Sequence, residues 1–170
     1  MALPVGAAAP DFSLPAVTAT YRHTVRLSEY LQQGHVVLLF HPADWTPTCT
    51  KEVIHFNKLR DEFAALGTQI LDISVDSVYS HMAWQEFQIG TVEFPMCSDF
   101  FPHGAVAEAY GILRRDEHPL AGISERAVFI VEKSGKIAFS KVYPLDIAPK
   151  ADQVLAEVKK LTQPRAETAR

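Results

Sequence analysis

Two apolar runs separated by a helical pattern constrain the fold of this chain more than any other feature. Residues 35–40 are apolar from Val36 onward, and residues 69–75, with Ile70, Leu71, Ile73 and Val75, predict a second buried strand. Between them, apolar residues recur at three- and four-residue steps, at Phe56, Leu59, Phe63 and Leu66. This spacing predicts a helix that ends at Gly67. Continuously apolar strands are typical of parallel sheets covered on both faces, so a β-α-β unit is expected at the centre of the fold.

The flanking segments extend this pattern to an α/β domain. Alternating runs at 11–14 and 24–27 predict a hairpin or two short strands, and Ser28 is expected to cap one helical turn over 29–33. The remaining expected elements are a helix capped by Asp76 or Ser77 that runs to Gly90, an extended segment at 94–97, a helix at 106–110, strands at 128–131 and 136–142, and a last helix that starts at Pro149. This order predicts a central mixed sheet with helices on both faces. One domain is expected over residues 1–161, with a mobile tail at 162–170.

Composition and charge exclude several classes of protein. The net charge of -4 and the pI near 5.9 argue against nucleic acid or an anionic membrane as a partner. No apolar run approaches the roughly 20 residues of a membrane helix, and residues 1–10 are too short and proline-broken for a signal peptide. Two cysteines in 170 residues do not make a secreted disulfide scaffold. A reducing, cytoplasmic location is therefore expected.

Cys49 is the candidate nucleophile. Thr46 is expected to be the N-cap of the long helix, with Pro47 at its first position. Cys49 then lies in the first turn, where backbone N–H groups lack partners and the helix dipole is positive, which favours a reactive thiolate. The alternative is a buried cysteine that acts as a small hydrophobic residue. The chain has no Cys-x-x-Cys, so dithiol exchange by a single motif is excluded.

The pattern Pro42-x-x-x-Thr46-x-x-Cys49 resembles the active-site motif of the peroxiredoxins. The resemblance continues at three further positions: Glu52, Trp84 and Arg126. It covers nearly the whole chain, from Ala9-Pro10-Asp11-Phe12 to the final helix. It implies the thioredoxin fold for the predicted α/β domain.

Two branches of that family share further segments with this chain. Residues 94–106 are similar to the alkyl hydroperoxide reductase E branch. Residues 41–44, His-Pro-Ala-Asp, and residues 143–146, Tyr-Pro-Leu-Asp, look more like the 1-Cys branch.

Ionisation of the cysteine supplies only part of the rate that such an enzyme needs. A cysteine of pKa about 8.5 is roughly 7% thiolate at about pH 7.4, so full ionisation gains only about 14-fold, or ~1.6 kcal/mol. A lower pKa also weakens the nucleophile. The larger contribution must come from groups that stabilise the charge developing on the two peroxide oxygens.

The resemblance implies a role for each matched residue. Arg126 would stabilise the thiolate and donate to peroxide, and Thr46 would hold the peroxide. Pro42 would form an apolar wall, and Glu52 would orient Arg126 from one turn along the helix. Ordinary structural explanations remain open for all of them: a helix cap for Thr46, a strand terminator for Pro42, a surface ion pair for Arg126, a solvated residue for Glu52, and packing for Trp84 and His41.

The role of Cys97 decides the second half of the reaction. A sulfenic acid on Cys49 must be reduced by another thiol, and residues 163–170 contain no cysteine. Cys97 either replaces an apolar core residue, which we favour, or resolves Cys49 through an intramolecular or intersubunit bridge, which requires Cα atoms within about 7 Å. The first alternative makes the protein a 1-Cys enzyme that uses an external thioredoxin-like, glutaredoxin-like or low-molecular-weight thiol.

The sequence therefore predicts a thiol peroxidase for hydrogen peroxide and small organic hydroperoxides. No cofactor is expected, and the seven histidines lack metal-ligand spacing. A homodimer or larger homo-oligomer is implied by the resemblance alone. The rivals are a peroxide sensor or holdase module that does not turn over, and a structural thioredoxin-like domain.

Overall fold

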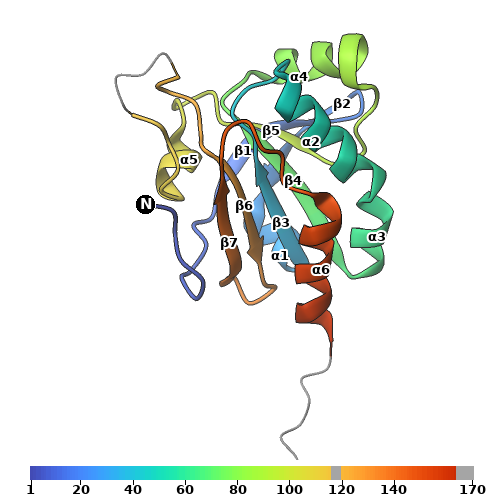
Figure 1. The fold of residues 1–170 in the computed structure, drawn as a ribbon, viewed down its shortest axis with the longest axis vertical. Coiled ribbons are helices and arrows are strands. Elements are labelled where there is room, and N and C mark those ends of the chain that lie inside the picture. Colours follow the sequence, from blue (N-terminus) through green and yellow to red (C-terminus); the bar gives the residue numbers. More distant parts are fainter. Residues whose placement is uncertain (116–119, 164–170) are drawn as a thin grey trace, which may run out of the picture.

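A computed structural model describes residues 1–115 and 120–163 of the chain. The seven strands are β1 (Ser13–Thr18), β2 (Tyr21–Arg26), β3 (His35–Phe40), β4 (Thr68–Ser74), β5 (Met96–Ser98), β6 (Arg126–Val131) and β7 (Ile137–Tyr143). They form one sheet in the order β2-β1-β5-β4-β3-β6-β7 (Figure 1). Strand β4 is parallel to β3 and β5, and all other neighbours are antiparallel. The predicted mixed sheet is therefore confirmed.

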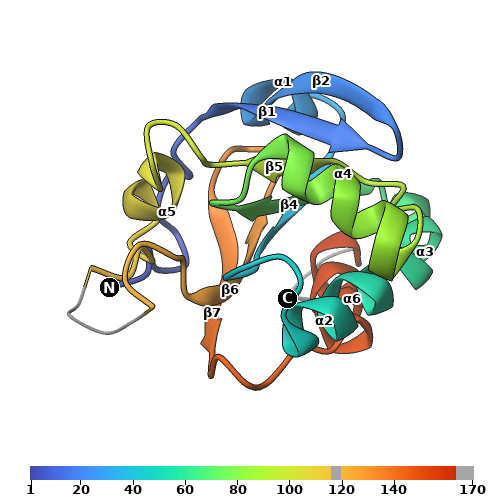
Figure 2. The ribbon, with the colours of Figure 1, turned by 90° about the horizontal axis from the view of Figure 1, so that it is seen from above.

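Helices cover both faces of this sheet, as predicted. Their bounds are α1 (Leu27–Leu31), α2 (Pro47–Lys58), α3 (Arg60–Ala65), α4 (Val78–Trp84), the π-helix η1 (Gln85–Ile89), α5 (Ala105–Ala109) and α6 (Ala151–Thr162). Helices α2, α3, α4 and α6 pack on one face, here called the α2 face, while α1 and α5 pack on the other, here called the α5 face (Figures 1 and 2). Along β3, Val37 and Leu39 point to the α2 face, and Phe40 points to the α5 face. Successive strand residues point to opposite faces, so this run is buried throughout.

The predicted helix from residue 47 to Gly67 is two helices. Leu59 departs from helical geometry, with φ -98° and ψ 4°, and separates α2 from α3. The guanidinium of Arg60 donates to the Asn57 carbonyl oxygen at 2.7 Å, which satisfies an acceptor near the break. Gly67 has φ +62° and follows the end of α3, as the sequence predicts.

The first helix begins differently from the prediction. Ser28 is already inside α1, and its N–H is satisfied by Asp11 Oδ1 at 2.9 Å. The cap therefore comes from the segment before β1 and not from the helix's own start. The hairpin is also longer than predicted, because β1 and β2 pair as far as Thr18 and Tyr21.

Two later helices differ from the sequence pattern at their ends. The helix predicted to run to Gly90 changes after Trp84 into the π-helix η1, and its start is capped by Ser77, whose Oγ accepts from Ser80 N at 3.1 Å. Helix α6 starts two residues after Pro149 and includes Thr162, which was assigned to the tail. From residue 164 on, the predicted tail lies outside the described residues.

Three aromatic rings form the centre of the core on the α5 face. The ring centroid of Phe129 lies 5.8 Å from that of Phe40 and 5.1 Å from that of Tyr110. All three side chains are fully buried. We expect Phe129→Ala to lower the free energy of unfolding by about 3–5 kcal/mol, because it removes buried area and leaves a cavity.

Urea denaturation of Phe129→Ala and Phe87→Ala measures this difference. Phe87 is 73% exposed, so its loss should change stability by less than about 0.5 kcal/mol. Equal losses in the two variants would contradict this account of the core.

Candidate active site

Cys49 lies in the first turn of α2, as predicted. Thr46 occupies the N-cap position with extended backbone angles, φ -76° and ψ 148°, and Pro47 is the first helical residue. The first hydrogen bond of the helix runs from Thr50 N–H to Thr46 O at 2.9 Å. The N–H groups of Thr48 and Cys49 precede that bond, so they belong to the donors that a helix start leaves for other partners.

The Thr46 side chain differs from the expected cap. Its hydroxyl donates its hydrogen to the carbonyl oxygen of Ala43 at 2.9 Å. That bond turns the lone pairs of the hydroxyl oxygen away from Ala43 and leaves them free to accept. The competition that the sequence suggested between capping and holding a substrate therefore does not arise.

Arg126 reaches Cys49 although 77 positions separate them. Strand β6 pairs with β3 so that Ala127 faces Phe40, and Arg126 therefore lies beside the loop that follows β3. Its Nη1 lies 3.3 Å from the Cys49 sulfur. Both side chains are buried, so their interaction is weakly screened by water.

Two groups hold the guanidinium in place. Arg126 Nη1 donates to the Glu52 carboxylate, and its Nε and Nη2 donate to the Leu145 carbonyl oxygen at 3.1 and 2.7 Å. Leu145 follows strand β7, whose Tyr143 pairs with Arg126. The alternative that Arg126 forms an ordinary surface ion pair is therefore wrong, because its guanidinium is buried and held in a fixed orientation.

Glu52 shares that cation with the sulfur. Burial raises the pKa of Glu52 to about 7, and the attraction of Arg126 offsets only part of this effect. Its Oε1 is buried and has no hydrogen-bond partner among the residues that the structure describes. Glu52 therefore titrates near neutral pH, and its protonation leaves the guanidinium to the sulfur.

The raised pKa of Glu52 makes the free energy of unfolding depend on pH. The folded protein binds the Glu52 proton more tightly than the unfolded chain, whose glutamate pKa is near 4.5. The contribution of Glu52 to the free energy of unfolding should then fall as pH rises from about 4.5 to 7. We expect the stability of the wild type relative to Glu52→Gln to fall over that range and to level off above it.

Urea denaturation at several pH values between 5 and 8 measures this difference, with Glu157→Gln on the surface of α6 as the control. A wild type that gains stability relative to Glu52→Gln as pH rises would mean that Arg126 holds the pKa of Glu52 below its usual value.

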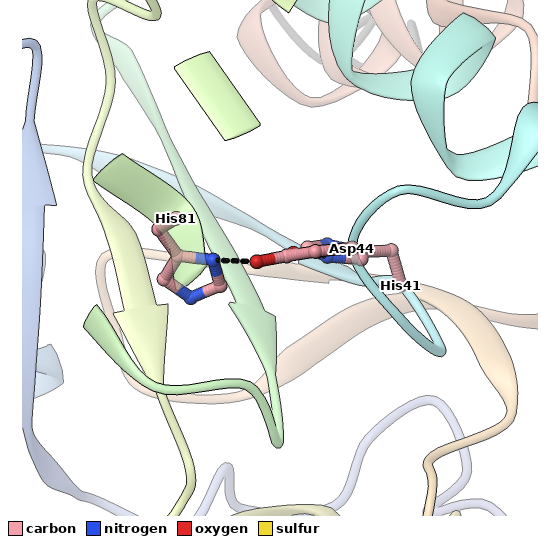
Figure 3. Close-up of side chains that lie close together, drawn as sticks. All are labelled: His41, Asp44 and His81. Carbon is pink, nitrogen blue, oxygen red and sulfur yellow. Dashed lines mark hydrogen bonds and ion pairs between the residues drawn. The ribbon is translucent and has the colours of Figure 1, made fainter. Parts of the chain in front are cut away.

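His41 enters a buried hydrogen-bonded chain on the α2 face. Its Nδ1 lies 2.7 Å from Asp72 Oδ1 on β4, and its Nε2 lies 2.6 Å from Asp44 Oδ1. The second oxygen of Asp44 lies 2.7 Å from His81 Nδ1 on α4, and Figure 3 shows it pointing at that ring. His81 Nε2 lies 3.0 Å from the Cys97 carbonyl oxygen. The chain thus links the loop after β3 to strands β4 and β5 and to helix α4.

The members of this hydrogen-bonded chain carry charges although they are buried. Burial lowers the pKa of both rings, but the carboxylates of Asp44 and Asp72 more than offset it for His41, and Asp44 more than offsets it for His81. The pKa of Asp44 is held below its usual range because hydrogen bonds from both imidazoles outweigh its burial.

The sequence spacing showed no metal site, yet the fold brings together three groups able to bind a metal. Ligand atoms of His41, Asp44 and His81 lie within 4.8 Å of one another. Every ring nitrogen of the two histidines is already engaged in a hydrogen bond of 2.6–3.0 Å. We therefore treat the cluster as a hydrogen-bonded chain.

Two predicted residues pack around the site. Pro42 is buried in the loop between β3 and α2. Trp84 is fully buried, its ring centroid lies 5.4 Å from that of His41, and its Nε1 donates to Gln88 Oε1 at 2.6 Å. The interpretation of Trp84 as a packing residue fits these contacts.

Cys97 and Cys49 lie on opposite sides of the sheet. Cys49 packs among the residues of the α2 face, and Cys97 packs among those of the α5 face, opposite Ile73 and Ala16 on its neighbouring strands. Both are free thiols. Burial, together with the negative charge of Asp72, raises the pKa of the Cys97 thiol well above its usual value. Cys97 thus occupies the core position that the sequence favoured.

Sequence reasoning missed Asp44, Asp72, His81 and the Leu145 carbonyl group. A signal for Asp72 was present, because an acidic residue inside an otherwise apolar strand requires a buried partner. His41 lies two residues after Leu39 and so points to the same face, which made it a candidate. Asp44 and Leu145 lie in the two segments that resemble the 1-Cys branch, but that resemblance assigned neither of them a role, and His81 carried no local signal.

Helices able to cross a membrane are absent from residues 1–115 and 120–163, since none combines the necessary length with sufficient apolar character.

Comparison with known proteins agrees with this geometry. A model of the AhpC/TSA family matches residues 5–140. The chloroplastic 2-cysteine peroxiredoxin of Chattonella marina var. antiqua is 37% identical over 160 residues, which cover 91% of this chain and 78% of that protein. A peroxiredoxin of Aeropyrum pernix is 37% identical over 154 residues, which cover 86% of this chain and 60% of that protein.

Solved structures show the same architecture. Mycobacterium tuberculosis AhpC superposes with a TM-score of 0.86 and 28% identity, over 99% of this chain and 97% of that one. The reduced 2-Cys peroxiredoxin of Plasmodium vivax has a TM-score of 0.84 and 28% identity, over 92% and 81% of the two chains. Since the family model spans most of the chain and the Chattonella relative, covered to 78% of its length, is 37% identical, the chain belongs to the AhpC/TSA family and is a peroxiredoxin, a thiol peroxidase with the thioredoxin fold.

Proposed function

We propose that Cys49 is the residue that attacks peroxide, and that the enzyme reduces hydrogen peroxide and small organic hydroperoxides through a sulfenic acid on this residue. The observation that carries the proposal is the 3.3 Å contact between Arg126 Nη1 and the Cys49 sulfur in a buried site at a helix start. A permanent cation beside the sulfur favours the thiolate. The same cation would stabilise the charge that develops on the peroxide oxygens during the attack.

In the first step, the Cys49 thiolate attacks one peroxide oxygen while the O–O bond breaks. The other oxygen leaves with a proton as water or an alcohol, and the sulfur becomes a sulfenic acid. Arg126 Nη1 and the N–H groups at the start of α2 are the donors available to the two oxygens. Thr46, whose hydrogen is donated to Ala43, would accept a hydrogen bond from the peroxide O–H. Pro42 lacks an N–H and would wall the site against water.

We further propose a 1-Cys cycle. A direct bond between Cys49 and Cys97 is disfavoured because the sheet lies between them. An external thiol would attack the sulfenic acid, releasing water and forming a mixed disulfide, and a second thiol would release Cys49 as the thiol. Several relatives are named 2-Cys peroxiredoxins, so this proposal separates the present chain from them.

The partners follow from this cycle as further proposals. The reductant would be a thioredoxin-like or glutaredoxin-like protein or a low-molecular-weight thiol. Two free cysteines suit a reducing, cytoplasmic environment, although some relatives are named chloroplastic. The assembly would be a homodimer or larger homo-oligomer, and the chemical step as written balances without a metal or organic cofactor.

Intact mass after one equivalent of hydrogen peroxide tests the cycle. We expect a gain of one oxygen atom per chain in the wild type and in Cys97→Ser, and no gain in Cys49→Ser. We also expect Cys97→Ser to consume peroxide at the wild-type rate. A loss of two hydrogen atoms per chain in the wild type alone would show that Cys97 resolves Cys49 and would end the 1-Cys proposal.

Steady-state peroxide consumption separates the enzyme from the sensor and holdase alternatives. With a thioredoxin system or a small thiol in excess, we expect many turnovers per chain, and none for Cys49→Ser. A single turnover with every donor class would favour the sensor.

A further inference from the structure

One carboxylate ties the loop that bears Thr46 to the rest of the α2 face. The Asp44 oxygens contact His41 Nε2 at 2.6 Å, His81 Nδ1 at 2.7 Å and Ser80 Oγ at 2.8 Å. The Asp44 N–H donates to Asp76 Oδ2 at 2.9 Å. Asp44 therefore has one partner within its own loop, His41, and others on α4 and in the segment between β4 and α4.

The loop needs such anchoring because its backbone is strained. Trp45, between Asp44 and Thr46, has φ +74° although it is not glycine, and its side chain is 43% exposed. This left-handed conformation costs on the order of 1–3 kcal/mol and persists only where the surroundings enforce it. The partly exposed Trp45 side chain does little to hold this backbone conformation. The neighbouring Asp44 holds it through four contacts, to His41, Asp76, Ser80 and His81.

Each contact along this hydrogen-bonded chain can be assigned one hydrogen, while the second Asp72 oxygen, Oδ2, is buried without a partner among the described residues. The Cys97 carbonyl oxygen can only accept, so His81 Nε2 carries a hydrogen. The three remaining bonds, from His81 to Asp44, from Asp44 to His41 and from His41 to Asp72, need one hydrogen each. Four hydrogens, two on each imidazole, leave two imidazolium rings beside two carboxylates, so the net charge of the hydrogen-bonded chain is zero.

A hydrogen-bonded chain with no net charge can remain buried, whereas a broken one cannot. Removal of one member leaves an unpaired charge or polar group inside the protein, and the structure relaxes to expose it. The covalently nearest relaxing segment is the loop of residues 41–46. The Arg126 guanidinium is held separately, by Glu52 and Leu145.

We propose that the chain Asp72–His41–Asp44–His81 is a clamp that holds Pro42 and Thr46 in position for the reaction with peroxide. This proposal rests on the proposed function of Cys49. Asp44 and His81 are positioning residues, since they act on the loop and do not touch the sulfur. When the clamp is broken, the Cys49–Arg126 contact persists and the groups that orient the peroxide are lost.

Two reagents that require different parts of the site, hydrogen peroxide and iodoacetamide, test the clamp. Hydrogen peroxide needs the oriented loop, whereas iodoacetamide needs only a reactive, accessible sulfur. For Asp44→Asn and His81→Gln, we expect the rate with peroxide to fall about 10- to 100-fold, as displacement of a positioned group does. The rate with iodoacetamide should stay near the wild-type value or rise.

His103→Gln is the matched control, because this exposed histidine makes one hydrogen bond, to Gly122 O at 2.6 Å, outside the clamp. Both of its rates should equal those of the wild type. Parallel losses with both reagents in Asp44→Asn, or no loss with peroxide, would overturn the proposal. A wild type whose Cys49 ignores peroxide would instead refute the proposed function.

Nuclear magnetic resonance of the wild type keeps the clamp testable if the variants do not fold. With nitrogen-15 in the histidine rings, we expect two rings to bear hydrogens on both nitrogens at about pH 7, above the usual histidine pKa. A neutral ring at either position contradicts the hydrogen count. Stoichiometric binding of Zn²⁺ by the wild type, lost in His81→Gln, would identify a metal site and would also overturn the proposal.

Discussion

Arg126→Lys should lower the rate constant for the reaction of Cys49 with hydrogen peroxide by about 10²- to 10³-fold, the cost of losing one oriented donor. Lysine keeps the charge but not the planar fork, which here donates to Glu52, to Leu145 O and toward the Cys49 sulfur at once. The variant should therefore lose the orientation of the cation while keeping its sign. Stopped-flow measurement of sulfenic acid formation gives the rate constant directly.

Arg114→Lys is the control for that experiment. Arg114 donates to Glu125 at 2.9 Å in a partly exposed pair, where a change of cation has little effect. Its rate with peroxide should match that of the wild type. If Arg126→Lys also reacted at the wild-type rate, charge alone would suffice and the geometric part of the proposed mechanism would be wrong.

Thr46→Val should lower the same rate constant by about 100-fold, near the lower end of the cost of removing a hydrogen-bonding group from a reaction site. Valine has nearly the shape of threonine but cannot donate to Ala43 O or accept from a peroxide. Helix α2 should form normally, since Thr46 does not cap it through its side chain. The iodoacetamide rate should change little, because alkylation does not use the hydroxyl.

Thr46→Ser serves as the comparison, since it restores the hydroxyl without the methyl group. We expect it to recover most of the rate lost in Thr46→Val. Equal losses in the serine and valine variants would show that the methyl group matters instead of the oxygen, and the acceptor role of Thr46 would be abandoned.

Local sequence patterns were sufficient where the determining contacts are local. The N-cap position of Thr46, the helix start at Pro47 and the first-turn position of Cys49 follow from residues within one turn of each other. The same holds for Ser77 at the start of α4. Local patterns failed where a distant segment supplied the hydrogen-bond partner, as where Asp11 accepts from the N–H of Ser28.

Helix continuity was the other local prediction that failed. Periodicity across α2 and α3 is unbroken in the sequence, yet Leu59 leaves helical geometry between them. Hydrophobic spacing reports which side chains face the core and does not report small changes of backbone direction. The change from α4 to the π-helix η1 escaped prediction for the same reason.

By itself, the sequence determined the α/β class, the helix that carries Cys49 and, through its motif, the family. Only the tertiary structure decided that Arg126 meets the sulfur and that Cys97 faces away from it. It also decided that His41 joins Asp44, His81 and Asp72 in one chain. The physical reason is that helix starts and strand alternation arise from neighbouring residues, whereas the pairing of β6 with β3 and the burial of charges depend on the packing of the whole sheet.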